Sequence, residues 1–458
     1  MTGLDLGKIV SKNISWLSTM KQKQGYAGPV SHYWKDSLVY IGPGTDWRYE
    51  GIIDSFLSLF EKTKDRKFLD MAVEAGDFML LNQKADGSFC NSAFEGNPSF
   101  HFSGTPHEAA VDLALLRLAA FLKKMKMDYK KYFLAAEKNL LEIQIRRFYE
   151  SSARAFLNYE KGRADNAPNK YVPNKIATAC EAFIAYYELT SKKKFLKIAI
   201  DASETILSLQ DKGDFYGGIY QANDRGKIIT LYTARCIPCL LKISAIAKSE
   251  RHMDSALDAC SFIEKMFSGE GFRFGYEKNS EGNFVRHDYP IFLAGSGDII
   301  RAVGLVKGYG RPTEKFMRPL IKSQDANGGF RTSYGMAHKL KEGSYSAKPS
   351  WRDIFPVVGW NDKALRLLSG LYADEKLCLP DFLGKFEFEC SDGSYFEDSK
   401  KIVVKGPENY SFCKQKRFSN GAEKIKSTFY DFALRTRGPV HLFARGLFKI
   451  GGNLRGLD

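Results

Sequence analysis

The chain has 458 residues, of which 44% are hydrophobic and 26% are charged, and these fractions are those of a globular protein. No apolar run approaches the ~20 residues that a membrane span needs, and the opening residues lack the pattern of a signal peptide, so we expect neither a spanning nor a secreted chain. The formal charge of +15 predicts an anionic partner, such as an acidic glycan, a phosphate-bearing substrate or a lipid headgroup.

Eight cysteines are scattered along the chain without the spacing of a disulfide framework. Cys236 and Cys239 form the one close pair in the sequence, and no second pair follows that would complete a zinc site. We interpret the two as buried thiols on one helix. The sequence therefore predicts a cytoplasmic protein with no metal and no cofactor.

A short motif that closes a helix recurs along the chain. Residues 47–63 and 67–82 predict two helices, and the second ends in Gln83–Phe89, with the pattern Gln-x-x-Asp-Gly-x-aromatic. The glutamines at positions 24, 83, 144 and 210 are 59, 61 and 66 residues apart, which is the length of two helices with their connections. The spacing predicts a repeat of helical hairpins. Related segments lie near residues 18–26, 143–146, 208–215, 269–272 and 323–330.

Each hairpin pairs an amphipathic helix with one that is apolar on nearly all sides. A helix that is apolar all round is buried all round, so we expect the second kind to form an inner layer. Inner helices are predicted near residues 47–63, 106–124, 173–189, 230–247, 290–306 and 351–371. Outer helices are predicted near residues 4–20, 67–82, 129–146, 192–209, 251–267 and 312–323. Because the series begins with an outer helix and ends with an inner one, a closed ring pairs the two, and the predicted fold is an all-α (α/α)6 toroid.

The predicted connections are unequal in length. Inner-to-outer joints are short, as at residues 64–66 and 190–191, whereas outer-to-inner connections have about 20–26 residues. Connections far longer than the ~4–6-residue median are usually functional or disordered, and these are rich in Phe and Tyr, which argues against disorder. We therefore expect the long loops on one rim, over the N-terminal ends of the inner helices.

The helical period stops near residue 374. Residues 386–404 alternate or run β-branched around a Ser-Asp-Gly turn and predict a short β-hairpin. From Lys400 to Asp458 there are 13 Lys and Arg residues against 4 Asp and Glu residues. We therefore expect a toroid over residues 1–373 and a small basic α+β module over residues 374–458. The basic amphipathic segment at residues 440–450 favours a tail packed on its own domain, with a peripheral membrane contact as the alternative.

Polar and aromatic side chains gather at the predicted starts of the inner helices. In a closed ring these starts converge on one funnel, where helix N-termini attract anions and carboxylates can act as acid and base. Aromatic rings offer stacking faces there, and arginines bind anionic groups in bidentate fashion. The predicted catalytic residues are Glu50, Asp46, Asp288, Asp353, His287 and His107. The predicted substrate-binding residues are Trp34, Trp47, Arg48, Tyr232, Arg235, Tyr289, Trp351 and Arg352.

Helix capping is the competing interpretation at several of these positions. Thr105–Glu108 has the form of a capping box, and Asp46 and Asp288 are good N-cap residues. Glu50 has no capping role in this register, so it is the first choice for a catalytic group, with Asp288 or Asp353 as its partner. Replacing Glu50 by glutamine is then expected to abolish turnover while sparing the fold.

The endings at Gln83–Phe89 and Gln324–Phe330 resemble the glutamine-aromatic repeats of squalene-hopene cyclases and protein prenyltransferases. They look equally like turns of six-hairpin glycosidases, uronate-processing lyases and sugar epimerases. The resemblance covers about residues 1–371 and implies a fold rather than an activity. The chain has no Asp-x-Asp-Asp proton donor and no Asp-Asp-x-x-Asp metal cluster. The polar, aromatic rim therefore favours a sugar over an isoprenoid.

Three functions are compatible with the sequence. The first is a carbohydrate-active enzyme, either a hydrolase, a lyase or an epimerase, that acts on an anionic glycan or glycolipid. The alternatives are a terpenoid-cyclase or prenyltransferase-like enzyme on an isoprenoid diphosphate, and a non-catalytic glycan-binding toroid. No nucleic-acid partner is expected.

Overall fold

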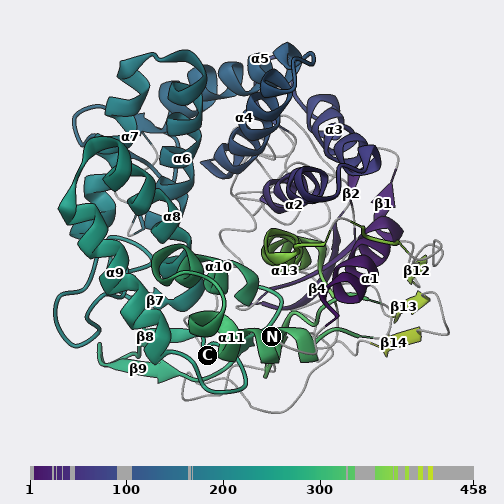
Figure 1. Cartoon of the computed structure of the whole chain (residues 1–458). Helices are drawn as coiled ribbons and strands as arrows, with labels where there is room; N and C mark the ends of the chain where they lie inside the picture. The colour runs from purple at the N-terminus through teal and green to yellow at the C-terminus, as the bar shows by residue number, and fades with distance from the viewer. Residues whose placement is uncertain are drawn as a thin grey trace.

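The fold is a ring of helical hairpins with short strands gathered beside it (Figure 1). It is seen in a computed structural model of the chain. The structure describes residues 5–22, 25–26, 28–32, 35–41, 47–89, 106–162, 167, 169–325, 328–335, 356–374 and 376–379, together with three strands at 387–390, 401–405 and 411–415.

Six described helices form the inner layer of the ring. Each inner helix packs against the next one, and the last packs against the first, so the inner layer is closed (Figure 1). These helices are α2 (Arg48–Thr63), α4 (Ala109–Lys124, preceded by the 3-10 turn η1, Pro106–Glu108), α6 (Pro173–Thr190), α8 (Thr230–Ala247), α10 (Ser296–Lys307) and α13 (Val358–Leu371).

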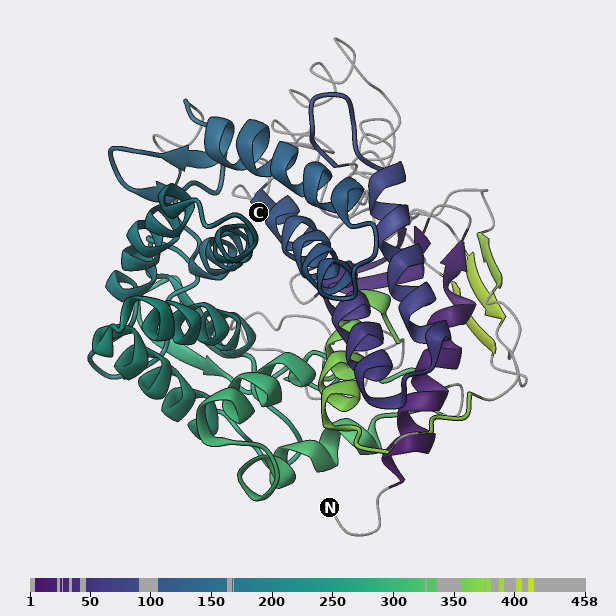
Figure 2. The same cartoon turned by 45° about the horizontal axis from the view of Figure 1, so that its top comes forward.

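The outer helices surround this layer, and each one packs on the inner helix that precedes it (Figure 2). The first outer helix has no predecessor in the chain and packs instead on α13. The outer helices are α1 (Leu6–Thr19), α3 (Arg66–Leu81), α5 (Lys130–Asn139, continued by the π-helix η2, Leu140–Phe148), α7 (Lys193–Ser208), α9 (Glu250–Lys265) and α11 (Arg311–Lys322).

Short joints connect each inner helix to its outer partner. Helices α2, α6 and α8 end at Lys64, Ser191 and Lys248, which adopt left-handed backbone with φ values of 57°, 59° and 51°. In each case the backbone N–H of this residue bonds to a carbonyl of the last helical turn, which satisfies one of the free groups at the helix end. A left-handed residue reverses the chain at once, so these joints need few residues.

In three of the described turns, a glutamine bonds the turn to another outer helix. The Nε2 group of Gln83 donates to the carbonyl of Gly87 in its own turn at 3.1 Å and to that of Ala135 in α5 at 2.8 Å. Gln210 reaches the carbonyl of Ser255 in α9 at 2.8 Å in the same way. We call this arrangement the glutamine latch. It explains why the sequence repeats a glutamine at the end of outer helices.

The same latch closes the ring. The Nε2 group of Gln324 donates to the carbonyl of Gly328 at 3.0 Å and to that of Ile9 in α1 at 2.9 Å. Beside it, Asn13 of α1 donates from Nδ2 to Oδ1 of Asn361 in α13 at 3.0 Å. The first outer helix therefore lies beside the last inner one, and the prediction of a closed ring is confirmed.

The aromatic residue of the repeated motif is anchored as well. The backbone N–H of Phe89 donates a hydrogen bond to Oε2 of Glu108 at 3.0 Å. The backbone N–H of Phe330 donates to Oδ1 of Asn361 at 2.6 Å. Both rings are fully buried, and both acceptors stand near the start of the next inner helix. Glu108 makes no side-chain cap bond to its own helix, so its carboxylate holds the preceding turn instead.

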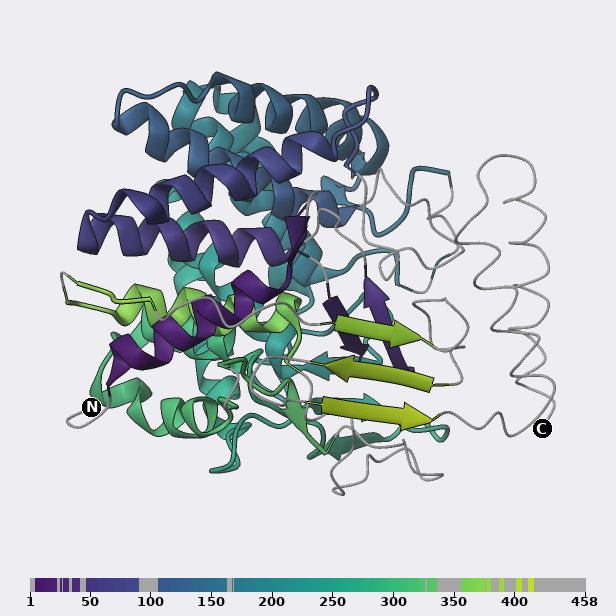
Figure 3. The same cartoon turned by 90° about the vertical axis from the view of Figure 1, so that its right-hand side faces the viewer.

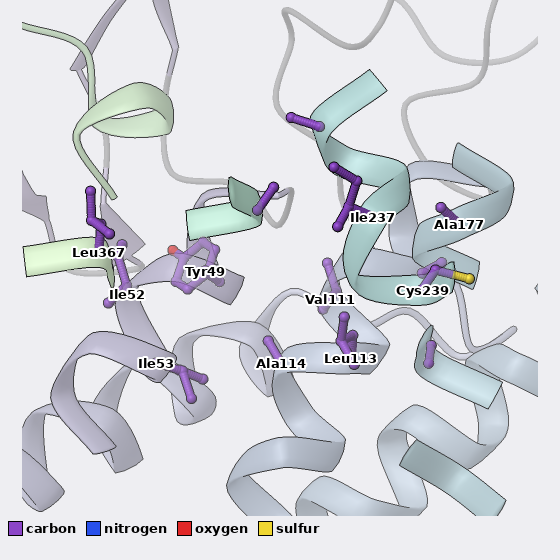
Figure 4. Close-up of a cluster of buried hydrophobic side chains, with 14 of the residues drawn as sticks. Tyr49, Ile52, Ile53, Val111, Leu113, Ala114, Ala177, Ile237, Cys239 and Leu367 are labelled. Atoms are coloured by element: carbon purple, nitrogen blue, oxygen red, sulfur yellow. The ribbon is translucent and has the colours of Figure 1, made fainter. Parts of the chain in front are cut away.

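Apolar side chains from neighbouring inner helices fill the space between them (Figure 4). Burying a side chain of valine, leucine or isoleucine stabilises the folded state by about 1.5–3 kcal/mol. Helix α8 is long and apolar enough to cross a membrane by composition alone, but 61% of that stretch is buried against its neighbours. The labelled residues are Tyr49, Ile52, Ile53, Val111, Leu113, Ala114, Ala177, Ile237, Cys239 and Leu367, none more than 2% exposed.

The strands collect on the side of the ring where the inner helices begin, opposite the short joints (Figure 3). All pairings are antiparallel: β1–β2, β3–β4, β5–β6, β7–β8–β9, β10–β11 and β12–β13–β14. Their bounds are β1 (Lys21–Gln22), β2 (Gly25–Tyr26), β3 (Gly28–His32), β4 (Lys35–Ile41), β5 (Tyr149–Glu150), β6 (Ala155–Phe156), β7 (Lys227–Ile229), β8 (Gly275–Lys278), β9 (Phe284–His287), β10 (Ile291–Phe292), β11 (Ser333–Tyr334), β12 (Glu387–Cys390), β13 (Lys401–Lys405) and β14 (Ser411–Gln415).

Two inner helices begin later than the sequence predicts. Helix α10 starts at Ser296 rather than near residue 290, and α13 starts at Val358 rather than near 351. In the first case, residues 291–292 are committed to β10, which pairs with β11, and Gly295 then precedes the helix. The apolar character of a buried strand had extended the predicted helix backward.

The predicted C-terminal hairpin is confirmed, because β12 pairs with β13. Glu387 lies opposite Lys405 at one end of the pairing, and Cys390 lies opposite Ile402 at the other. A third strand, β14, continues the sheet. The basic segment at residues 440–450 lies outside the described residues. The division into two domains at residue 373, the cytoplasmic location and the membrane contact of the tail stay predictions.

Replacing Gln324 by alanine is expected to lower the free energy of unfolding by about 1–3 kcal/mol, since two carbonyls lose their partner where the ring closes. Chemical denaturation of the variant and the parent measures the difference. Lys322→Ala, which changes the exposed last residue of α11, is the control. If Gln324→Ala unfolded at the parent's denaturant midpoint, the latch would not contribute to closure.

Candidate functional site

Every inner helix sends a charged side chain toward the ring axis. The charges form one set of ion pairs, which we call the axial network. On α4, α6 and α13 these charged residues lie at least two turns from the start of the helix, so the network sits inside the ring rather than at its edge. Its members are Glu50 and Asp54 of α2, Arg117 of α4, Glu181 of α6, Arg235 of α8, Asp298 and Arg301 of α10, and Arg366 of α13.

Glu50 is the central carboxylate of the network. Its Oε1 accepts hydrogen bonds from Arg366 at 2.6 Å and Arg117 at 3.1 Å, and its Oε2 accepts one from Arg235 at 2.9 Å. The three donors come from α13, α4 and α8, so this side chain ties four inner helices together. One turn further along α2, Asp54 pairs with Arg117 and Arg366 as well.

The other two carboxylates extend the network around the ring. Glu181 of α6 is fully buried and lies 3.2 Å from Arg117 and 3.2 Å from Arg235. Asp298 of α10 receives a hydrogen bond from Arg366. Arg117, Arg235 and Arg366 therefore each pair with at least two acidic side chains, which offsets the cost of burying these charges.

The arginines keep two axial carboxylates, Glu50 and Asp298, ionised. Burial alone would raise the pKa of Glu50, but Arg235, Arg366 and Arg117 hold that pKa well below its ordinary value. At Asp298 burial again raises the pKa, but nearby cations, chiefly Arg366, outweigh it and lower the pKa to about 2. A carboxylate that accepts three charge-assisted hydrogen bonds cannot donate a proton and is a weak base. These surroundings suit Glu50 to positioning arginines, and its catalytic role stays a prediction.

The end of the ring where the inner helices begin carries aromatic and polar groups, and we call it the upper mouth. The Nε1–H of Trp47 donates to the carbonyl of Gly359 in α13 at 3.1 Å, and its ring lies 6.1 Å from that of His107. Lys363 donates to the carbonyl of Trp47 at 3.3 Å. Tyr232, in the first turn of α8, is partly exposed. The structure thus brings Trp47 and His107 together at this mouth, and their predicted roles stay predictions.

Asp362 is a buried carboxyl group between α13 and α2. Its Oδ2 accepts a hydrogen bond from Lys363 at 2.6 Å, while its Oδ1 has no hydrogen-bond partner among the described residues. Burial raises the pKa of Asp362 to about 7, even though Lys363 opposes the shift. Gly51 makes the close approach of the two helices possible, since a Cβ there would overlap Asp362.

Arg48 does not face the axis. Its Nη1 donates to the carbonyl of Tyr26 at 2.8 Å, which fastens β2 to the start of α2. The substrate-binding role of Arg48 stays a prediction. A helix turns ~100° per residue, and Glu50 and Asp54 occupy the face that looks inward, so Arg48 points elsewhere.

The cluster at residues 286–290 is not a helix start, which contradicts the prediction. His287 ends β9, and the pairing of β9 with β8 keeps this segment extended. Asp288 caps no helix and is held by Arg273 at 2.9 Å. Tyr289 lies edge-on to Tyr334, with ring centroids 5.9 Å apart. His287 itself is buried beside this strand pair. These three side chains belong to the rim sheet rather than to the inner-helix starts.

The remaining predicted site residues lie outside the part of the chain that the structure describes. Their roles stay predictions. They are Asp46, Asp353, Trp34, Trp351 and Arg352.

Sequence reasoning missed most of the axial network. It looked for polar clusters at helix starts, whereas Arg117 and Glu181 are single charges in the middle of apolar helices. That position was itself a signal, because a charge on a helix that is buried all round must meet a counter-charge. Arg235 was found because it stands close to a helix start.

Cys236 and Cys239 are free and buried, as interpreted from the sequence. Burial raises the pKa of Cys236, and a hydrogen bond with Cys180 together with burial raises that of Cys239, so both are neutral thiols. Among the described residues, no group of three or more His, Cys, Asp or Glu side chains could hold a metal ion.

The sequence matches no protein-family model, and a search of curated proteins returns no significant match. Solved structures do share the fold. An unsaturated glucuronyl hydrolase specific for heparin superimposes with a TM-score of 0.55 at 11% identity, over 79% of this chain and 95% of that one. A D-mannose isomerase gives 0.54 at 12% identity, over 81% and 99%. The cellobiose 2-epimerase of Bacillus thermoamylovorans B4167 gives 0.54 at 12%, over 79% and 98%.

At these identities the likeness shows the fold alone. The chain has the (α/α)6 toroid fold, so the predicted fold is confirmed. The small sheets at the rim accompany a mainly helical structure.

Replacing Glu50 by glutamine is expected to destabilise the fold by about 3–5 kcal/mol, because it leaves buried arginines without their shared counter-charge. This revises the expectation from sequence that the fold is spared. Glu188→Gln, at an exposed position of α6, is the matched control. Equal thermal midpoints for Glu50→Gln and the parent would argue that the network does not hold the ring together.

Asp362 is expected to make stability depend on pH. Its folded-state pKa is raised to about 7, so its contribution is fully present below the ordinary value near 4 and is lost as the pH rises through 7. Asp362→Asn should therefore flatten the fall in unfolding free energy between pH 4 and pH 7. Denaturant titrations at a series of pH values measure this slope, and an unchanged slope in the variant would contradict the assignment.

Proposed function

We propose that the chain is a carbohydrate-active enzyme that acts on an anionic glycan or glycan conjugate at the upper mouth. The observation that carries the proposal is the pair of Trp47 and His107 at this mouth, with Tyr232 partly exposed at the start of α8. The N-terminal ends of the inner helices add partial positive charge at the same place. This partial charge favours an anionic group, such as the carboxylate of a uronic acid.

Aromatic groups at the mouth support a sugar as the bound molecule. The ring of Trp47 lies next to that of His107, and Tyr232 is partly exposed at the start of α8. The apolar face of a sugar ring packs well on an aromatic ring, and polar groups beside the ring can bond its hydroxyls. Proteins of similar fold that are named for sugar isomerisation, sugar epimerisation and glucuronyl hydrolysis support the substrate class by analogy.

The described side chains favour proton abstraction over hydrolysis by two carboxylates. Hydrolysis of a glycosidic bond commonly uses one carboxylic acid and one carboxylate. In the described part of the axis, Glu50, Asp54, Glu181 and Asp298 are all engaged with arginines. His107 is a mouth residue of the type that exchanges protons near neutral pH.

Epimerases and lyases share a first step that such a site can perform. A base removes the proton next to a carbonyl or carboxylate, and the electron pair moves onto the oxygen, where cationic groups stabilise it. We assign the base to His107 and the stabilising charge to Arg235. An epimerase or a lyase therefore comes before a hydrolase in this proposal.

The test is to incubate the protein with uronic-acid oligosaccharides and with neutral sugars in heavy water. Nuclear magnetic resonance should detect deuterium entering the carbon next to the carbonyl or carboxylate, or the unsaturated product of a lyase. His107→Asn should lower kcat by about 10²–10⁴-fold, the usual contribution of a general base. His252→Asn is the control. His252 belongs to the outer helix α9, and its ring bonds Ser203 of α7 and Ser249 at the start of α9 rather than any group at the upper mouth.

Parent-level exchange by a folded His107→Asn would remove the role of His107. Glycan binding without turnover of any sugar would favour the non-catalytic binding toroid. Turnover of an isoprenoid diphosphate that requires Mg²⁺ would favour the terpenoid-cyclase or prenyltransferase-like alternative.

A further inference from the structure

The axial network is more exposed on the side where the inner helices end. Three helices carry two charged axial residues at different depths, and on each of them the residue nearer the C-terminus is the more exposed. Side-chain exposure rises from 3% at Glu50 to 21% at Asp54, from 12% at Arg235 to 34% at Lys242, and from 7% at Asp298 to 16% at Arg301. The network is therefore reached from below, through the end of the ring that bears the short joints.

We call this end the lower mouth and define it by Arg117, Lys242, Arg301 and Tyr309. Tyr309 follows the end of α10 and folds back over that helix, where its hydroxyl donates to the carbonyl of Arg301 at 3.3 Å. Gly304 leaves the space for the tyrosine ring, since a Cβ at that position would overlap it. Arg301 is thus placed at the lower edge of the network, and α8, which carries Lys242, packs directly against α10.

Arg301 has too little negative charge around it. Among the described residues Arg301 forms an ion pair with Asp298, in which Nε lies 3.8 Å from Oδ1. The carboxylate of Asp298 is also bonded to Arg366. The Nε–H of Arg301 is buried without a hydrogen-bond partner in the described part of the chain. Burial and the charges of Arg366 and Arg117 lower the pKa of Arg301. The guanidinium thus lies among cations without its full set of acceptors.

Lys242 is in a similar position on the adjacent helix. Its ammonium group lies 4.0 Å from Glu181, the limit of an ion pair, and Glu181 is already shared by Arg117 and Arg235. Two cations on neighbouring helices, Arg301 and Lys242, therefore have only weak ion-pair partners. Leaving a partly buried charge unpaired costs free energy, which a bound anion would recover.

We propose that the lower mouth binds a small oxyanion of the phosphate type between Arg301 and Lys242, with Arg117 as a third cation. A guanidinium can bond two oxygens of a phosphate at once, and an ammonium group adds a mobile point charge. The ligand would be either inorganic phosphate or the phosphate group of a small monoester. The site lies on the other side of the axial network from the upper mouth, so it is separate from the proposed sugar reaction.

The test is titration calorimetry of the full chain with sodium phosphate, and with glucose 6-phosphate, at constant ionic strength set by sodium chloride. We expect saturable binding of phosphate by the parent protein and a rise in its thermal midpoint. Arg301→Met should weaken the affinity at least tenfold. Arg251→Met is the matched control, since Arg251 is an exposed arginine of α9 paired with Glu204 at 2.9 Å.

Lys242→Met keeps the proposal testable if Arg301→Met fails to fold, because Lys242 is the more exposed cation and has the weaker ion pair. It should also weaken phosphate binding at least tenfold. Binding of glucose 6-phosphate as well as phosphate would identify a monoester site, and binding of phosphate alone a free-anion site. No binding by the parent, or equal affinity in the parent and both lower-mouth variants, would overturn the proposal. Sugar turnover measured on the same samples reports on the upper mouth separately.

Discussion

Charges buried on the ring axis can be neutralised only when the ring is complete. Glu50 belongs to the first inner helix and Arg366 to the last, and their 2.6 Å hydrogen bond spans most of the sequence. A single buried charge without its partner costs several kcal/mol, so an open arrangement of the same hairpins would be strongly disfavoured. The axial network therefore does more than stabilise a finished ring. It makes the closed ring the arrangement in which charges of the first and last inner helices meet.

The two rims of the ring have different tasks. On one rim, left-handed residues such as Lys64 and Ser191 reverse the chain at once and leave little surface to vary. On the other rim, glutamine latches and buried aromatic residues fix only the base of each long connection. The rest of each connection can differ without disturbing the inner helices. A fold built this way keeps its scaffold constant while the walls of the upper mouth change.

The sequence predicted the ring because its evidence is periodic and local. Apolar inner helices alternate with amphipathic outer ones, and the boundaries of α8 agree with the prediction to the residue. Side-chain direction was harder, because it depends on the phase of each helix. Arg48 and Glu50 are two residues apart, yet one reaches outward to Tyr26 and the other meets three arginines on the axis. The segment around His287 was misassigned because a buried strand and a buried helix look alike in composition.

The closing contacts also constrain how the chain can fold during synthesis. Ile9 leaves the ribosome long before Gln324, the residue whose side chain bonds its carbonyl. Until α13 has emerged, α1 lacks the helix on which it packs, and the carboxylate of Glu50 lacks Arg366. Contacts between such distant parts of a chain form slowly, and apolar surface exposed in the meantime promotes aggregation. Nascent chains of this protein should therefore depend on chaperones until the last inner helix is made, and shortened chains that end before it should be poorly soluble.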